Sequence, residues 1–488
     1  MLFSSITFLY YFLPVTMLIY FVVPEKRKNL VLLMASFLFY FWGEPKYCIL
    51  MAVSILAGYV GGIAIEIVRR KSDLCQISDG AIEQTEADRK VQNKLKLITV
   101  CFVGVILLFL AIFKYADFAI EIVSGITSTK LPLFNLTLPI GISFYSFQII
   151  SYLIDVYRGS IPAEQNLIDF ASYVVMFPQL IAGPIVRFLD VQKELKCRKS
   201  SFSDVADGIV RFSLGLAKKV LIADVLGELV IKLDTVSNKH TLIYWIVAIV
   251  YTLQIYYDFS GYSDMAIGLG RMLGFHFPEN FNYPYIAKSV TEFWRRWHMT
   301  LGGWFRDYVY IPLGGSRVSF GRWMINVFIV WLLSGLWHGA SLNYVLWGLY
   351  YGLLLLLEKL FLKKILDRLP SALTHMYTLF FVVSGFVLFR LENLSEAGTY
   401  LAGMFGIGSS RGLDIVSIYQ IKSYLFIIAI ALLGATPFWK SAIKRLKENK
   451  KGRMAVEIAS PVLVFGILIL VTAFLIQSSV HPFLYFRF

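Results

Sequence analysis

Long apolar runs separated by short polar loops recur along the whole chain. They lie near residues 2–23, 30–42, 47–68, 97–113, 138–156, 168–181, 209–231, 242–257, 324–337, 345–362, 376–389, 425–438 and 461–476. A helix that crosses a bilayer needs about 20 mostly apolar residues, so the pattern predicts about 11 spans. We expect the shorter runs to form re-entrant or buried helices. The fold class is therefore predicted to be all-α, as a polytopic membrane protein.

Composition supports the membrane class and changes how the charge is interpreted. Of the 488 residues, 57% are hydrophobic and only 16% are charged, whereas soluble domains carry about 25% charged residues. The net charge of +14 comes from Lys and Arg gathered in short loops beside apolar runs, which is the pattern of cytoplasmic loops. A basic stripe with interleaved aromatics, which a nucleic-acid groove needs, is absent from the sequence. The expected partner is the lipid bilayer and not nucleic acid.

The basic loops also predict an orientation. They fall at residues 25–29, 69–96, 193–200, 359–368 and 440–453. Placing all five in the cytoplasm puts the N-terminus and the C-terminal tail, residues 481–488, on the outer side. Residues 69–96 are polar throughout, and we expect a flexible cytoplasmic loop there. The four cysteines are scattered without metal-ligand spacing, so we expect no metal site.

The middle of the chain, residues 139–352, differs from the rest in being rich in Gly, Pro, Asn, Asp, Arg and Trp. Irregular backbone at membrane depth is tolerated only where protein buries it or water reaches it, so this region is expected to line a cavity. His338 lies there between two long apolar runs. An ionisable residue inside a membrane is costly, which favours a functional role. The alternative is a core histidine that bonds a neighbouring carbonyl.

Several segments of this region resemble the membrane-bound O-acyltransferase family, and more closely its alginate O-acetyltransferase-like branch in bacteria. They are PIGISFYSFQ, FPQLIAGPI, YYDFSGYSDMAIGLGRMLGF, NFNYPYIAKSVTEFWRRWHMTLGGWFRDYVYIPLGG and SGLWHGASLNYVLWGLYYG. The resemblance implies one integral-membrane domain over residues 1–488, with its catalytic core in residues 139–352. It also implies a funnel of helices around a central histidine. Acyl transfer would start from a cytoplasmic thioester and end on an acceptor outside.

The resemblance further implies that His338 is the catalytic residue and that His298 is a second important polar position. Acylation of a hydroxyl needs a base, donors for the oxyanion and exclusion of water. An imidazole, with its pKa near about 6.5, suits the role of base. We expect His338 to act as the general base and His298 to assist it.

Other polar and aromatic residues are candidates for supporting roles. Trp294, Arg295, Arg296 and Arg306 are candidates for donor binding, and Asp258, Ser263, Asn343 and Gln148 are supporting polar candidates. Guanidinium groups fit the phosphates of coenzyme A. The arginines would equally fit an interfacial belt in which their charged ends reach water. For the second group, hydrogen bonding between helices is the favoured alternative.

The C-terminal tail carries the remaining candidate. Its end, FLYFRF, resembles a C-terminal motif of this branch and of small partner peptides of its D-alanyl-transferring relatives. Tyr485 is the only hydroxyl in that motif, and a base would make it a nucleophile. We expect Tyr485 to act as an acyl relay. The alternative is a tail that only caps the last helix at the membrane surface.

Together these features predict an enzyme of the bacterial cytoplasmic membrane that transfers acetyl groups to an exported cell-surface polysaccharide. Acetyl-CoA is the expected donor substrate, and no bound cofactor is expected. The resemblance implies a separate extracytoplasmic partner, a serine-hydrolase-like acetyltransferase. One alternative is a D-alanyl or longer-acyl transferase of the same fold, as in teichoic acid modification. Another is a proton-coupled transporter, against which the lack of internal repeats counts.

Overall fold

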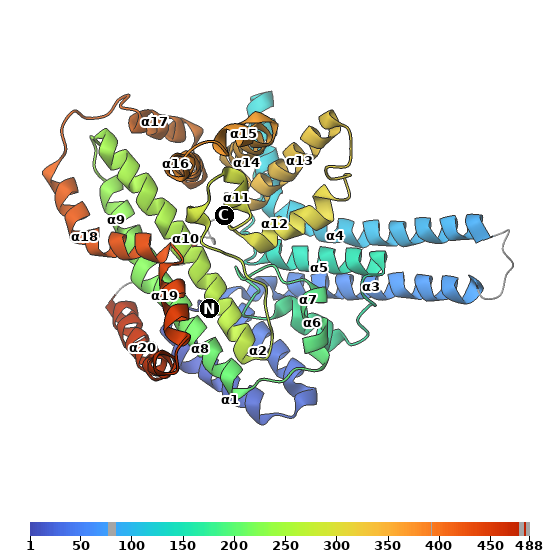
Figure 1. Cartoon of the computed structure of the whole chain (residues 1–488). Coiled ribbons are helices and arrows are strands. Elements are labelled where there is room, and N and C mark those ends of the chain that lie inside the picture. The colour runs from blue at the N-terminus through green and yellow to red at the C-terminus, as the bar shows by residue number, and fades with distance from the viewer. Residues whose placement is uncertain (77–83, 392, 478–482, 485–488) are drawn as a thin grey trace. The chain divides into compact units, whose positions relative to one another are not determined.

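The computed structural model describes residues 1–76, 84–391, 393–477 and 483–484, and these residues fold into helices joined by loops. The chain divides into two compact helical units, whose helices are labelled in Figure 1. Unit 1 comprises residues 1, 7–204 and 273–278, and unit 2 comprises residues 2–6, 205–272 and 279–488. The predicted all-α, polytopic class is confirmed.

Eight helices in the described part of the chain are long and apolar enough to cross a membrane. They are Pro45–Lys71, Asp88–Thr127, Thr241–Met272, Phe320–His338, Leu342–Leu366, Ser371–Arg390, Ile415–Gly434 and Lys450–Gln477. The sequence predicted about 11 spans from the length that a bilayer requires. Part of the difference lies in shorter helices such as α5 (Ile142–Arg158), which has 17 residues and is almost entirely buried. Such helices match the expectation that some apolar runs are buried within the protein.

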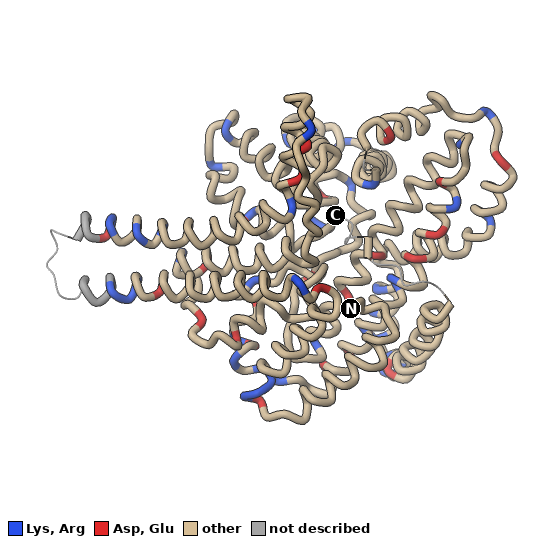
Figure 2. The backbone as a smooth tube through the Cα atoms, turned by 180° about the vertical axis from the view of Figure 1, so that it is seen from behind, with Lys and Arg blue, Asp and Glu red and all other residues tan. Residues whose placement is uncertain are grey.

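The described part of unit 1 contains seven complete α-helices. They are α1 (Leu13–Val22), α2 (Lys28–Gly43), α3 (Cys48–Gln76), α4 (Gln84–Thr127), α5, α6 (Leu167–Val175) and α7 (Phe188–Lys196). Helices α3 and α4 lie side by side, and α5 packs against both (Figure 1). Figure 2 shows basic residues gathered toward the outer ends of α3 and α4.

The segment 69–96 departs from the expected flexible loop. Helix α3 continues to Gln76 and α4 begins at Gln84, so the described part of this segment is helical. The sequence QTEADRKVQNKLK at the start of α4 consists largely of residues with good helix propensity. Its polarity reflects helices that continue into water, where a polar surface is favourable on all sides.

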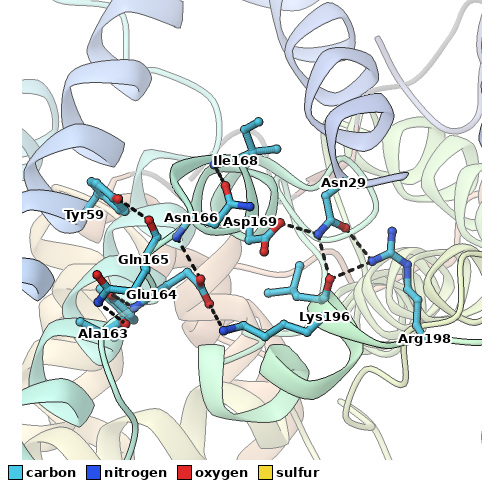
Figure 3. Close-up of polar contacts among 12 residues, drawn as sticks. Asn29, Tyr59, Ala163, Glu164, Gln165, Asn166, Ile168, Asp169, Lys196 and Arg198 are labelled. Carbon is cyan, nitrogen blue, oxygen red and sulfur yellow. Dashed lines mark hydrogen bonds and ion pairs between the residues drawn. The ribbon is translucent and has the colours of Figure 1, made fainter. Parts of the chain in front are cut away.

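A buried polar network ties the helices of unit 1 together (Figure 3). The guanidinium of Arg198 donates to Asn29 Oδ1 at 2.6 Å and to the Tyr20 hydroxyl at 2.7 Å. Asn29 in turn donates to Asp169 Oδ1 at 2.6 Å. A buried charge is tolerated when hydrogen bonds compensate its lost hydration. The network therefore fixes α1, α2 and α6 against the segment that follows α7.

Unit 2 holds most of α8 and all later helices. They are α8 (Phe202–Ala217), the π-helical turn η4 (Lys218–Ala223), α9 (Asp224–Asp234), α10 (Thr241–Met272), α11 (Val290–Trp294), α12 (Met299–Phe305), α13 (Phe320–His338), α14 (Leu342–Leu357), α15 (Lys363–Leu366), α16 (Ser371–Arg390), α17 (Leu394–Met404), α18 (Ile415–Gly434), α19 (Phe438–Lys447) and α20 (Lys450–Gln477). Helix α10 is buried along most of its length and packs against α9, α16, α17 and α18. It forms the centre of this unit.

Helices α13 and α14 approach each other closely at two glycines. A Cβ atom on Gly335 would collide with the backbone carbonyl of Tyr344, and one on Gly348 would collide with that of Trp331. Small residues at such crossings allow membrane helices to pack backbone to backbone. This crossing lies one turn before the end of α13, so it sets the position of His338.

Candidate active site

His338 is the last residue of α13, and its imidazole is buried among aromatic rings. The ring lies 5.0 Å from the Trp347 indole of α14 and 5.2 Å from the Phe389 ring of α16, edge to face in both cases. Gly339 follows in extended conformation and ends the helix. A Cβ at Gly339 would collide with the Tyr344 ring. The glycine therefore allows the chain to turn while the imidazole stays inside the aromatic cluster.

His298 occupies the N-terminal cap of α12 in a left-handed backbone conformation, with φ of 45°. Its side chain is buried, and Nδ1 lies 3.0 Å from Asn280 Oδ1. The hydroxyl of Thr300 donates to the same oxygen at 2.9 Å, while Asn280 Nδ2 donates to Ser263 Oγ at 3.1 Å. An amide oxygen can only accept. Nδ1 therefore carries the proton, and Nε2 carries the lone pair.

Burial also determines the charge of this histidine, which lies outside the eight candidate spans. Burial of the ring lowers the pKa of His298 to about 3, because the charged form loses its hydration. The imidazole is therefore neutral at physiological pH. In this form Nε2 can accept a hydrogen bond without taking on charge.

The two histidines contact the same side chain. The Trp337 indole lies 5.8 Å from the His298 ring and 5.0 Å from the His338 ring, measured between centroids. On its other side the His298 ring meets Phe259 at 4.7 Å. The structure therefore brings together the two histidines that the sequence selected from positions forty residues apart.

Two cavities lie in unit 2, and His298 lines the smaller of them, whereas His338 is in the lining of neither. The smaller has a volume of about 200 Å³ and is lined by His298, Trp294, Arg306 and Ser334, among others. Ser334 lies one helical turn before His338 on α13. The larger has a volume of about 870 Å³. Tyr310, Val330 and Trp331 line both cavities, so the cavities adjoin each other.

The larger cavity is rich in charge. Its lining includes four basic residues, Lys288, Arg295, Lys359 and Lys363, and three acidic residues, Glu292, Glu358 and Asp367. The carboxylate of Glu358 accepts hydrogen bonds from the backbone N–H groups of Val290 and Thr291 at 2.7 and 2.8 Å. That acid therefore caps α11, and Lys363 is paired with Asp367 at 3.1 Å, which leaves Lys288, Arg295 and Lys359 as the other basic residues of the lining.

The four donor-binding candidates lie in different places. Trp294 and Arg306 line the smaller cavity, and Arg295 lines the larger one. Arg306 also pairs with Asp307 at 2.6 Å. In the described part of the chain, Arg296 instead pairs with Glu292 at 2.8 Å and donates to a backbone carbonyl. Arg296 therefore resembles a structural residue more than the other three do.

The supporting candidates also separate. Ser263 joins the chain of hydrogen bonds to His298 through Asn280. Asp258 pairs with Lys219, and Asn343 donates to the carbonyl of Leu391, which fixes the start of α14.

Two further candidates lie away from this group. Gln148 is buried in α5 of unit 1, and Tyr485 lies outside the described residues.

Sequence reasoning missed two residues. Asn280 sits in a loop eighteen residues before His298, and nothing local marks it as a partner of that ring. Lys219 lies inside the apolar run 209–231. The rule that singled out His338, an ionisable residue within a predicted span, applies equally to Lys219 and would have found it.

Comparison with known proteins agrees with this architecture. The model of the MBOAT, membrane-bound O-acyltransferase family matches residues 160–394. The chain is 43% identical over 413 residues to the probable alginate O-acetylase AlgI of Pseudomonas aeruginosa, covering 84% of this chain and 76% of that protein. It is 39% identical to the probable alginate O-acetylase AlgI of Pseudomonas putida over the full length of both.

A third relative is the peptidoglycan O-acetyltransferase of Helicobacter pylori, which is 33% identical over 443 residues, or 83% of this chain and 80% of that protein. These similarities extend over both units, well beyond the segments around the two histidines. The chain is an O-acyltransferase that belongs to the membrane-bound O-acyltransferase family, in its alginate O-acetylase-like branch.

Proposed function

We propose that the protein transfers an acetyl group from cytoplasmic acetyl-CoA toward hydroxyls of an exported polysaccharide at the bacterial cytoplasmic membrane. The relatives named as alginate O-acetylases and as a peptidoglycan O-acetyltransferase support acetyl as the group and a cell-surface glycan as the acceptor. The observation that carries the proposal is the pair of buried imidazoles on either side of Trp337, of which His298 lines the smaller of two adjoining cavities.

The larger cavity is the proposed entrance for the donor. Coenzyme A combines phosphates with a narrow arm that ends in the thioester. Arg295 and the neighbouring lysines offer charge for the phosphates, and guanidinium groups bind phosphate in a planar, two-pronged geometry. The arm would continue into the smaller cavity, where Trp294 and Arg306 line the walls beside His298. Its volume of about 200 Å³ favours a short acyl group over a long chain.

His338 is the proposed general base. It takes the proton of the attacking hydroxyl as the hydroxyl oxygen bonds to the thioester carbonyl carbon. When the carbon–sulfur bond breaks, the imidazolium returns the proton to the leaving thiolate, which completes the balance of atoms and charge. His298, neutral at physiological pH, would assist by helping to hold the attacking hydroxyl. The aromatic walls exclude water, so hydrolysis of the thioester is disfavoured.

Tyr485 is the proposed first acceptor. The acyl-tyrosine would then present the acetyl group to a serine-hydrolase-like acetyltransferase outside the membrane. This part of the proposal comes from the resemblance of the tail to its branch.

The test is acetyl-CoA turnover by the purified protein in lipid vesicles. His338→Ala should lower the rate by about 10²–10⁴-fold, as loss of a general base does. His375→Ala is the matched control, because His375 is another histidine of unit 2 whose Nδ1–H donates to the backbone carbonyl of Ala287 at 2.8 Å, away from Trp337 and the aromatic rings around His338. Near-wild-type turnover in the His338 variant would overturn the assignment.

A further inference from the structure

A buried ion cluster in unit 2 takes no part in the chemistry above. Lys219 is 1% exposed and sits in the π-helical turn η4, between α8 and α9. Its ammonium lies 2.7 Å from Asp224 Oδ1 and 2.6 Å from Asp258 Oδ1. Desolvating three ionisable groups is expensive. The presence of this costly cluster among apolar side chains therefore needs a structural explanation.

The two described residues of the C-terminal tail, Phe483 and Leu484, lie directly against this cluster. The backbone N–H of Leu484 donates to Asp258 Oδ2 at 2.9 Å. The Phe483 ring is 1% exposed and lies 4.7 Å from the Lys219 ammonium, a cation–π contact. The same ring meets Tyr262 edge to face at 4.6 Å. A backbone group and a side chain of the tail are therefore both held.

The two oxygens of the Asp258 carboxylate bind different partners. One oxygen binds the lysine and the other binds the tail, so a single carboxylate joins the buried cation to the backbone of the C-terminal segment. With one lysine and two aspartates, the cluster offers more acceptors than the ammonium alone needs. The Leu484 N–H supplies the additional donor.

We infer that Lys219 and Asp258 form an intramolecular docking site for the chain's own C-terminal tail, with Phe483 and Leu484 as the bound residues. The docking site rests on the contacts above, whereas its consequence for acyl transfer rests on the proposed function. Consecutive Cα atoms lie about 3.8 Å apart. Fixing Leu484 therefore restricts where the side chain of the next residue, Tyr485, can begin. Lys219 and Asp258 are positioning residues in this scheme.

The first experiment measures tail release from the full-length protein in lipid nanodiscs. Carboxypeptidase is added, and intact mass follows the removal of Leu484 and Phe483. Phe483→Leu removes the aromatic ring and leaves the ion cluster untouched. Asp258→Asn leaves an amide, which accepts at one atom only, so one of the two contacts is lost. Both variants should release the tail about tenfold faster than wild type, since Phe483→Leu loses the cation–π contact and Asp258→Asn loses a charge-assisted hydrogen bond.

Two matched variants serve as controls. Asp264→Asn changes another ion-paired aspartate of α10, which binds Lys218 and Arg211 and not the tail. Phe438→Leu changes an exposed ring of α19. Both should release the tail at the wild-type rate. If Phe483→Leu also releases it at the wild-type rate, the docking site is wrong.

A second readout separates docking from relay. Acetyl transfer to an external acceptor is measured on the same variants. Faster tail release with lower transfer supports the docking site and its role in positioning Tyr485. Faster release with unchanged transfer keeps the docking site and overturns its role in positioning Tyr485. Unchanged release with lost transfer overturns the docking site and leaves the relay standing.

Discussion

Replacing Asn280 with leucine tests how His298 is oriented. The amide oxygen of Asn280 accepts from His298 Nδ1–H at 3.0 Å and from the Thr300 hydroxyl at 2.9 Å. Leucine has a similar size but no acceptor, so the Nδ1–H would be left buried and unbonded. Leaving a buried donor unsatisfied costs about 1–3 kcal/mol. The ring would then turn or change tautomer, and Nε2 would no longer present its lone pair.

The magnitude follows from that cost. If the orientation of His298 that supports catalysis becomes less stable by about 1–3 kcal/mol, the rate falls by about 5- to 150-fold. We expect Asn280→Leu to lower kcat by that factor. The KM for acetyl-CoA should stay nearly unchanged, because the Asn280 side chain bonds none of the basic residues that line the two cavities. Steady-state kinetics on the reconstituted enzyme measures both parameters. Asn326→Leu is the control, since Asn326 is also buried but bonds the backbone carbonyls of Leu313 and Gly315.

Asn280→Asp provides a second test through pH. The wild-type His298, whose pKa burial lowers to about 3, stays neutral across the neutral and mildly acidic range. A carboxylate beside Nδ1 stabilises the imidazolium and raises that pKa. Activity that needs the neutral ring would then fall as the pH drops through the raised pKa. The reasoning is refuted if Asn280→Leu keeps the wild-type kcat, or if the Asp variant keeps the wild-type pH profile.

Three further changes test other parts of the structure. Arg295→Gln should raise the KM for acetyl-CoA severalfold with little change in kcat, whereas Arg296→Gln, which loses its pairing with Glu292 and its bond to the Asn282 carbonyl, should leave this KM unchanged; equal effects would contradict the donor assignment. Tyr485→Phe should abolish the acyl adduct seen by intact mass and acetyl transfer to an external acceptor; full transfer would exclude the relay. Gly335→Ala should lower the free energy of unfolding by about 1–3 kcal/mol through overpacking of α13 on α14, and an unchanged melting temperature would contradict the close crossing.

The membrane class and much of the helical architecture follow from the sequence because the bilayer requires long apolar helices. Polar stretches are harder to interpret. Residues 69–96 are hydrophilic, yet their described part is helical, since helices that leave the membrane need no apolar face. The length of a run also does not distinguish a span from a buried helix, as α5 illustrates.

The two histidines were predictable because each stands out locally, His338 by its apolar surroundings and His298 by its motif. Their partners were not equally visible. Asn280 reaches His298 only because the chain turns back on itself, with Asn280 O accepting from the backbone of Met299 at 2.9 Å. Such pairing depends on tertiary structure and leaves no periodic signal. The contact between Lys219 and the tail joins residues more than 260 positions apart, which local sequence patterns do not encode.

The backbone at His298 limits which amino acids can replace it. Its φ of 45° lies in the left-handed region, which most side chains avoid and which Asn, Asp and His occupy several-fold more often than others. The fold therefore selects a short list of polar residues at this position before any chemistry does. An alanine there would combine loss of the imidazole with backbone strain, so its defect would overstate the role of the ring. Asparagine, which accepts the same conformation, is the substitution that isolates the contribution of the imidazole itself.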